Sequence, residues 1–225
     1  MTWLFNPPAP VALAILGRDA RFPVRRILCV GQNYAAHARE MGADPARETP
    51  FFFSKPRDAL ITQADVPFPS ATENLHHEVE LVCAIGGEGA DLSPAAAADL
   101  IIGWAVGVDL TRRDVQAEAK SRGRPWDASK GFDHSAPCGP LTLGALPSPG
   151  GAVLLTVNGQ TRQSSRLDQM IWSPAEVVAE ASRLWRLMPG DLIFTGTPEG
   201  VGPVVRGDRI EATIEGLAPL AFTLT

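Results

Sequence analysis

The chain has 225 residues, of which 45% are hydrophobic and 20% are charged, and its formal net charge at pH 7 is −5. This composition is typical of a globular protein, and the absence of a basic block argues against nucleic acid as a partner. The longest apolar run, residues 100–108, is too short to cross a bilayer, and the N-terminus lacks the features of a secretory signal.

Three cysteines, Cys29, Cys83 and Cys138, are odd in number and far apart in the sequence. Structural disulfides belong to oxidising compartments and come in pairs, so this pattern does not favour them. We therefore expect reduced, mostly buried thiols in a cytoplasmic protein.

The first half of the chain predicts short strands joined by loops. Residues 1–24 are rich in proline and alanine and are expected to form an arm or a small hairpin. Strands are expected at 27–30, 51–53 and 59–61. A short helix follows the first strand and ends at Gly42, and a second helix begins at Ser93-Pro94, since serine is a preferred cap and proline suits the first helical position.

The second half carries clearer boundary signals. Thr111 and Asp114 have the spacing of a helix cap and predict a helix that Gly123 ends. Two strands, 153–157 and 160–163, flank Asn158-Gly159, the preferred turn of a two-residue hairpin.

Ser173 and Glu176 form a capping box, which predicts another helix. Pro189-Gly190 should stop this helix, and later strands are expected at 192–194 and 210–214. Its apolar face is expected to carry Val177, Val178, Ala181, Leu184 and Met188. Strands dominate, no regular strand–helix–strand period appears, and no linker divides the body. An α+β domain of mainly β structure fits best.

Three carboxylates stand at the ends of apolar runs. Glu78 and Glu80 begin one run and share a face if it is a strand, while Asp109 ends another. Buried carboxylates must be paired or must bind a metal, and three together favour Mg²⁺ or Mn²⁺. Alternatively, the two glutamates line the solvated face of an edge strand. His76 and His77 are left outside the metal shell, because such a histidine more often orients a ligand or packs.

His37 and Glu40 are three residues apart on the first predicted helix and share a face. A carboxylate bonded to one imidazole nitrogen makes the other a better base, as activation of a water molecule requires. A solvated helix surface with a chance pair is an equal alternative. The polar loop 42–50 that follows is hinge-like, so this segment is a candidate lid.

Two loops carry weaker signals. Lys130 lies in a loop flanked by glycine and proline, where it could neutralise the charge of an enolate, although a surface lysine is the simpler interpretation. Residues 195–202 form a glycine-rich loop whose backbone N–H groups could bind a carboxylate or phosphate, although most such loops are turns.

Together these segments resemble the fumarylacetoacetate hydrolase family in order and spacing, over roughly residues 25–225. The matching stretches are GQNYAAH at 31–37, KP at 55–56, HHEVEL at 76–81, GVDLTRRD at 107–114, KGFD at 130–133, VNG at 157–159 and GDLIFTGTP at 190–198. Within the family, FFFSKP at 51–56 and GRPWD at 123–127 look most like bacterial fumarylpyruvate hydrolases.

The resemblance implies a β-roll-like catalytic domain over 25–225, with a few short helices, that forms a homodimer. It implies Mg²⁺ or Mn²⁺ on Glu78, Glu80 and Asp109, and a catalytic His37–Glu40 pair together with Lys130. The expected substrate contacts are Gln32, Tyr34, Arg113, Gln116 and Thr197. Gln32 departs from the arginine of many relatives, which would alter how a substrate carboxylate is held.

There are three hypotheses for function, and relatives of this length imply the first two. The first is hydrolysis of a carbon–carbon bond in a 2,4-diketo acid, such as fumarylpyruvate or another acylpyruvate, to pyruvate and a carboxylic acid. The second is decarboxylation of oxaloacetate, or a decarboxylase/isomerase reaction of aromatic degradation, at the same metal site. A metal-stabilised scaffold without catalysis is the third.

Overall fold

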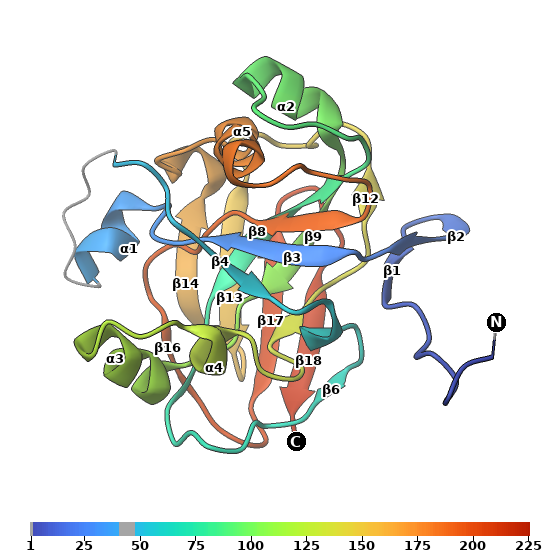
Figure 1. Ribbon diagram of the computed structural model, residues 1–225. Helices are drawn as coiled ribbons and strands as arrows, with labels where there is room; N and C mark the ends of the chain where they lie inside the picture. Colours follow the sequence, from blue (N-terminus) through green and yellow to red (C-terminus); the bar gives the residue numbers. More distant parts are fainter. Residues whose placement is uncertain (1, 41–47) are drawn as a thin grey trace.

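Strands dominate the fold of the computed structural model, which describes residues 2–40 and 48–225 (Figure 1). The α+β class of mainly β structure predicted from the sequence is confirmed. Among the described residues, no helix is long and apolar enough to span a membrane.

A six-stranded sheet forms the centre of the molecule. Its strands in spatial order are β12 (Thr142–Leu143), β9 (Ile101–Val108), β8 (Val79–Ile85), β15 (Asp191–Phe194), β3 (Arg26–Val30) and β4 (Phe52–Lys55). The β15–β3 pair is parallel and the other neighbours are antiparallel. Every residue of β8 is buried, which explains why its sequence is an almost continuous apolar run.

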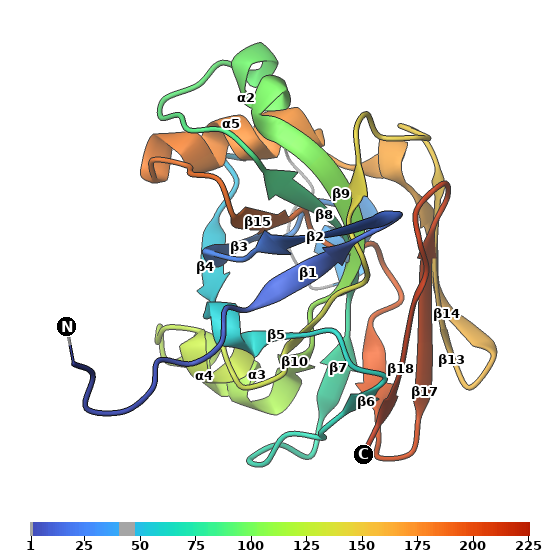
Figure 2. The same cartoon turned by 90° about the vertical axis from the view of Figure 1, so that its right-hand side faces the viewer.

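A five-stranded sheet packs against one face of this central sheet (Figure 2). Its strands are β14 (Gln160–Arg166), β13 (Ala152–Val157), β17 (Arg209–Ile214), β18 (Leu220–Leu224) and β6 (Asp65–Val66). The predicted hairpin is confirmed, with φ of 51° at Asn158 and 75° at Gly159, as a turn of this type requires. Along β17, which lies where a strand was expected, Ile210, Ala212 and Ile214 are buried.

One three-stranded sheet and two strand pairs complete the described fold. They are β10 (Thr111–Arg112), β7 (Leu75–His77) and β16 (Gly202–Val204) in one sheet, β11 (Ala136–Pro137) with β5 (Leu60–Ile61), and β1 (Ala12–Ile15) with β2 (Arg18–Pro23). The β1–β2 hairpin lies within the segment 1–24, and its Leu13 and Phe22 pack with the core. The division into an arm and a single domain at 25–225 stays a prediction.

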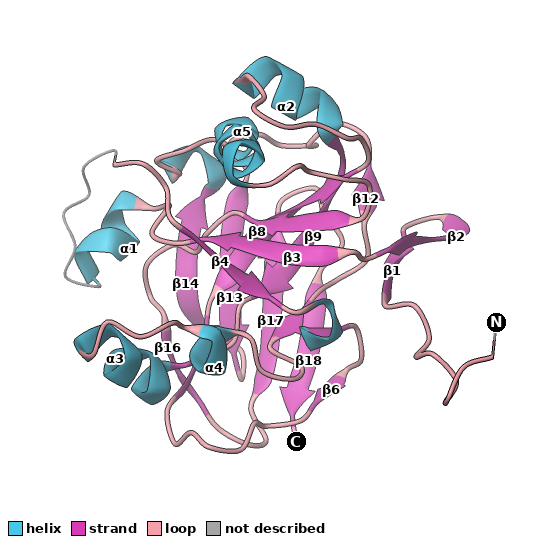
Figure 3. Ribbon diagram, in the orientation of Figure 1, coloured by secondary structure: helices cyan, strands magenta, loops and turns pink. Residues whose placement is uncertain are grey.

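The helices lie around the margins of the strands (Figure 3). They are α1 (Ala35–Glu40), α2 (Pro94–Leu100), α3 (Arg113–Ser121), α4 (Asp127–Lys130) and α5 (Pro174–Leu184), with 3₁₀ turns η1 (Arg57–Ala59) and η2 (Leu167–Gln169). Ser93 caps α2, and the capping box of Ser173 and Glu176 is present at α5, both as predicted. The predicted end of the first helix at Gly42 lies outside the described residues.

The predicted start of α3 at Thr111 is wrong. Thr111 pairs with His76 in the β10–β7 ladder, and Arg112, without a capping side chain, precedes the helix. The carboxylate of Asp114 accepts hydrogen bonds from Thr72 Oγ1 at 2.6 Å and from the Glu73 backbone N–H at 3.0 Å. Thr111 therefore belongs to strand β10, and Asp114 holds the loop at residues 72–73.

The predicted apolar face of α5 is wrong at its last two positions. The helix ends at Leu184, whose exposure is 60%, and Trp185 has the extended backbone angles φ −141° and ψ 139°. Met188 lies beyond the helix and is half-buried, while Leu187 is buried in its place. The helical period breaks where the chain turns towards β15.

Two apolar clusters cover the two faces of β8. Val79, Leu81, Cys83 and Ile85 belong to the cluster shared with the five-stranded sheet, whereas Val82 and Ala84 belong to the cluster under the β1–β2 hairpin. Burial of each large aliphatic side chain contributes about 1.5–3 kcal/mol. The strand register is therefore firmly fixed, and with it the face on which Glu80 lies.

Burial of the three cysteines is as predicted. Cys29, Cys83 and Cys138 are free thiols, and all three are buried.

Candidate active site

The register of β8 and β9 brings three carboxylates together. Val79 pairs with Val108 and Glu80 with Gly107, and the Asp109 N–H donates to the Glu78 carbonyl oxygen at 2.8 Å. One ligand oxygen from each of Glu78, Glu80 and Asp109 lies within 4.8 Å of the others. We call these residues the carboxylate trio. Their exposures of 5%, 2% and 0% exclude the solvated edge strand.

Buried lysines compensate part of this negative charge. Lys130 Nζ lies 2.8 Å from Glu78 Oε2 and 2.6 Å from Asp109 Oδ2, and it donates to Thr111 Oγ1 at 2.6 Å. Lys55 Nζ lies 2.8 Å from the other Asp109 oxygen. Burial lowers the pKa of Lys130, but Asp109 and Glu78 raise this pKa above its usual value, so Lys130 is a cation.

The two glutamates of the trio differ in charge compensation. Burial raises the pKa of Glu78, but Lys130 and Arg113, which contacts Glu78, hold that pKa well below its usual range. Burial and the charges of Asp109 and Glu78 hold the pKa of Glu80 well above its usual range. Among the described residues, Glu80 has no ion-pair partner, and it accepts a hydrogen bond from the Gly196 N–H at 2.7 Å.

The trio fits a hard divalent cation. Its donors are carboxylate oxygens, the ligand type that Mg²⁺ and Mn²⁺ prefer. The uncompensated charge of buried Glu80 is the local reason to bind one, because a buried carboxylate without a cation is costly. That the trio binds a metal ion stays a prediction.

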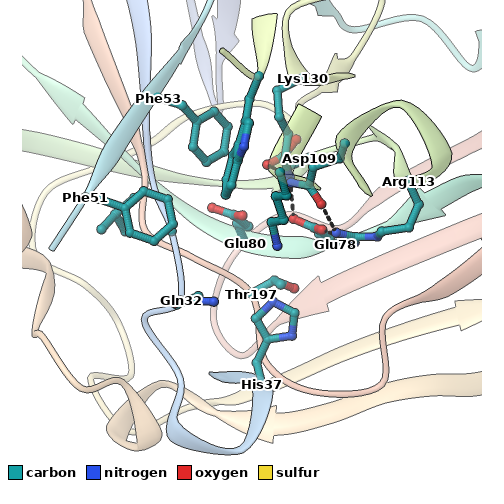
Figure 4. Close-up of a pocket in the computed structure, with 15 residues that line it drawn as sticks. Gln32, His37, Phe51, Phe53, Glu78, Glu80, Asp109, Arg113, Lys130 and Thr197 are labelled. Carbon is teal, nitrogen blue, oxygen red and sulfur yellow. Dashed lines mark hydrogen bonds and ion pairs between the residues drawn. The ribbon is translucent and has the colours of Figure 1, made fainter. Parts of the chain in front are cut away.

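The His37–Glu40 pair lies across the pocket from the trio. His37 Nδ1 is 3.3 Å from Glu40 Oε2, and the Gly200 N–H donates to the same carboxylate at 3.2 Å. Figure 4 shows the His37 ring on the opposite side of the pocket from Asp109 and Lys130. Glu40 is thus placed to orient the imidazole. Most of the loop predicted to act with α1 as a lid lies outside the described residues.

The pocket between these groups is polar at its base and aromatic on one side (Figure 4). The space that these residues enclose, including the part open to solvent, is about 390 Å³. Phe51, Phe53 and Trp126 form the aromatic wall. The Phe51 and Trp126 ring centroids are 5.4 Å apart at 89°, and those of Phe53 and Trp126 are 5.9 Å apart.

Four of the five predicted substrate contacts line this pocket: Gln32, Arg113, Gln116 and Thr197. Gln32 has φ of 57°, a left-handed conformation that is uncommon outside glycine and often found at functional sites. Arg113 Nη1 donates to Gln116 Oε1 at 2.6 Å. Tyr34 is buried and is not among the lining residues, so its expected contact stays a prediction without support from the pocket.

The sequence analysis missed Gln163, a fully buried residue of β14. Its Oε1 accepts from the Val79 N–H at 3.0 Å and lies 3.1 Å from His77 Nδ1. Its Nε2 donates to Thr197 Oγ1 at 2.8 Å and to the Pro198 carbonyl at 2.9 Å. Gln163 therefore ties the hairpin to the start of β8, between Glu78 and Glu80. A polar residue in a hairpin gives no sign of this before the sheets are assembled.

Lys55 was also missed as a partner of the trio. Lys55 ends β4 and is the one buried residue of that strand. Its ammonium group is fully buried and also donates to the carbonyl oxygens of Leu110 at 3.2 Å and of Lys130.

The two neighbouring histidines lie outside the trio. Burial and then Arg113 lower the pKa of His76 to about 4, and burial lowers the pKa of His77. His76 Nε2 lies 2.9 Å from Asn74 Oδ1. Both rings are therefore neutral and held by polar neighbours.

The glycine-rich loop binds the protein's own glutamates. Gly196 and Gly200 donate their N–H groups to Glu80 and Glu40, respectively. Gly196 has φ of +93°, and a Cβ there would lie 2.7 Å from Asn33 Cβ. No larger residue fits at Gly196 without a shift of the neighbouring chain. The loop thus holds Glu80 on one side of the pocket and Glu40 on the other.

Known proteins are similar to this chain in sequence and in fold. The family model for the C-terminal part of fumarylacetoacetate (FAA) hydrolase matches residues 26–225. The crystal structure of fumarylpyruvate hydrolase from Pseudomonas aeruginosa in complex with Mn²⁺ and pyruvate is similar, with a TM-score of 0.96 and 51% identity, over 100% of this chain and 99% of that one.

Curated relatives include two enzymes named for different activities. Fumarylpyruvate hydrolase of a Ralstonia species is 44% identical over 183 residues, which are 80% of this chain and 95% of that protein. Mitochondrial oxaloacetate tautomerase of Mus musculus is 41% identical over 201 residues, 88% of this chain and 90% of that protein.

Proposed function

The chain belongs to the fumarylacetoacetate hydrolase family, and we propose that it is a metal-dependent hydrolase of 2,4-diketo acids. The observation that carries this proposal is one pocket with the carboxylate trio on one side and the His37–Glu40 pair on the other. The substrate would be fumarylpyruvate or another acylpyruvate, and the products would be pyruvate and a carboxylic acid. The similar Pseudomonas structure, which holds Mn²⁺ and pyruvate, supports this choice.

Glu78, Glu80 and Asp109 would hold Mg²⁺ or Mn²⁺. When bound, the cation would act as a Lewis acid that stabilises negative charge on the substrate oxygens. Arg113, which contacts Glu78, would bind the substrate carboxylate together with the neighbouring polar side chains of Gln116 and Thr197.

The His37–Glu40 pair would start the reaction. Glu40 orients the imidazole, and His37 takes a proton from a water molecule while the water oxygen bonds to C4 of the diketo acid. The C3–C4 bond then breaks and leaves its electron pair on C3, which gives the enolate of pyruvate. The ammonium group of Lys130 offsets this negative charge. The His37 imidazolium returns its proton to C3, so the products are pyruvate and the carboxylic acid.

An oxaloacetate-directed reaction is the second candidate. The 41% identity to an oxaloacetate tautomerase favours this candidate. Tautomerisation needs proton transfer at C3 of oxaloacetate and no attack by water. The decarboxylation considered from the sequence likewise requires no attacking water. We prefer hydrolysis because the His37–Glu40 pair is suited to activating a water molecule.

A substrate panel separates these reactions. The purified protein is assayed with fumarylpyruvate, acetylpyruvate and oxaloacetate, each with Mn²⁺ and with excess chelator. We expect pyruvate release from an acylpyruvate in the presence of Mn²⁺ and its loss with chelator. Turnover of oxaloacetate without any acylpyruvate cleavage would overturn the proposal and favour the second candidate.

A further inference from the structure

Helix α3 carries a third polar residue that lines the pocket, Lys120, which has no part in the proposed reaction. Arg113, Gln116 and Lys120 are spaced i, i+3 and i+7, so they share one face, and all three line the pocket. Arg113 contacts Glu78 and Gln116. Lys120 has no carboxylate or hydrogen-bond acceptor as partner in the described part of the chain. Its Nζ lies 5.0 Å from the centroid of the Trp126 ring, and the residue is exposed.

The aromatic wall connects this lysine with the carboxylate trio. At one end, Lys130 Nζ lies 5.0 Å from the Phe53 ring centroid. The Phe53 ring is 5.9 Å from that of Trp126, and Lys120 lies over Trp126 at the other end. A flat, conjugated acyl chain would pack along these rings, with its reacting end at Lys130 and its far end at Lys120.

The charge of the site leaves room for a second anionic group. Lys55, Arg113 and Lys130 each form an ion pair with Glu78 or Asp109. Lys120 lines the same pocket but has no carboxylate partner among the described residues. Burial, followed by the positive charge of Arg113, lowers the pKa of Lys120, an effect that a nearby anion would oppose.

We propose that Lys120 binds a second carboxylate at the far end of the acyl group, and that the enzyme thereby prefers dicarboxylic acylpyruvates. The inference rests on the proposed function and deepens it, because it assigns the acyl-chain preference to a named residue. The competing interpretation is a surface lysine that packs on Trp126 without contacting substrate.

Two matched substrates test the proposal. Fumarylpyruvate and crotonylpyruvate have the same planar chain, but a methyl group replaces the distal carboxylate in the second. For Lys120→Met, we expect kcat/KM for fumarylpyruvate to fall about tenfold, the loss typical of one charged hydrogen bond. The value for crotonylpyruvate should stay within about twofold of the wild type by the same reasoning. Lys120→Arg should retain most of the preference, because it keeps the charge.

Arg122→Met is the matched control. Arg122 follows the same helix and pairs with exposed Glu118 outside the pocket, so this variant removes the same charge from the same region. It should leave both kcat/KM values unchanged. Equal losses for the two substrates in Lys120→Met, or no loss for either, would overturn the proposal.

A binding titration keeps the two proposals distinguishable. If the wild type cleaves neither compound, the proposed function fails, but the same compounds can still be titrated as ligands by tryptophan fluorescence with Mn²⁺ present. Tighter binding of fumarylpyruvate than of crotonylpyruvate, lost in Lys120→Met and kept in Arg122→Met, would support the role of Lys120. Equal binding of both by the wild type would contradict it.

Discussion

At the scale of single residues, the pocket balances buried charge. Lys130 is shared by Glu78 and Asp109, and Lys55 of the edge strand β4 supports Asp109. Removal of one partner from such a buried pair typically costs about 3–5 kcal/mol, because the other charge is left alone. Glu80 receives no such support from the described residues, which makes it the member of the trio with most to gain from a cation.

Replacement of His37 by alanine tests the proton-transfer role. We expect kcat for acylpyruvate hydrolysis to fall by roughly 10²–10⁴-fold, the usual contribution of a general base. Mn²⁺ affinity, measured by titration with electron paramagnetic resonance detection, should not change, because His37 lies outside the trio. A variant that retains the wild-type rate would show that another group activates the water.

The cysteines should be inert in the folded protein. Burial raises the pKa of Cys138 to about 12 and raises the pKa values of Cys29 and Cys83 as well. Since the thiolate is the reactive form, a disulfide reagent at pH 8 should label no thiol in the native state and three per chain in denaturant. Rapid labelling of the native protein would contradict this burial.

At the scale of elements, local signals predicted what neighbouring residues determine. The Asn158-Gly159 turn and the caps at Ser93 and Ser173 were found because each depends on a few adjacent positions. The alternation around Glu78 and Glu80 placed both on one face. Thr111 was misassigned because its pairing with β7 comes from a distant segment.

Long-range contacts account for what was missed at the site. Gln163 meets Val79 across 84 positions in the chain, and Lys55 meets Asp109 from a different strand. In the sequence Lys120 is an ordinary helical lysine, and only the fold shows that it lies over the Trp126 ring. No pattern of spacing reports such meetings, because they follow from how the sheets and helices pack.

Gln163→Leu tests the tie between β14 and the head of β8. We expect a loss of about 1–3 kcal/mol in the free energy of unfolding, because the polar groups of Val79 and Thr197 lose a buried partner. Urea denaturation measures this loss. Gln160→Leu, at an exposed position of the same strand, is the control and should change stability by less than about 0.5 kcal/mol. Equal stability of both variants would contradict the role of Gln163.

At the scale of the whole molecule, the site depends on elements from most of the chain. The trio comes from the start of β8 and the end of β9, and the His37–Glu40 pair comes from α1. Other pocket walls come from β4, α3, α4 and the loops beside them. The homodimer implied by the family resemblance stays a prediction. In the arm before β1, Trp3, Leu4 and Phe5 are 66%, 96% and 75% exposed.

A bound cation should stabilise the whole fold, because it neutralises charge that is buried only in the native state. At a Mn²⁺ concentration of about 100 times Kd, the gain is about 2.7 kcal/mol, or roughly 5–10 °C in Tm for a chain of this size. Differential scanning fluorimetry with Mn²⁺ and with chelator measures it. A Tm that Mn²⁺ does not change would contradict a metal site at the trio. A metal-dependent Tm without turnover of any diketo acid would favour the scaffold.

The most direct test of the central claim is pyruvate release from fumarylpyruvate by the wild type and by Glu80→Gln, each with and without Mn²⁺. We predict one pyruvate and one fumarate per substrate molecule for the Mn²⁺-loaded wild type. Release should cease with chelator, and Glu80→Gln should lose both tight Mn²⁺ binding and pyruvate release. Release that is unaffected by chelator, or Glu80→Gln that binds Mn²⁺ and turns over like the wild type, would contradict the account.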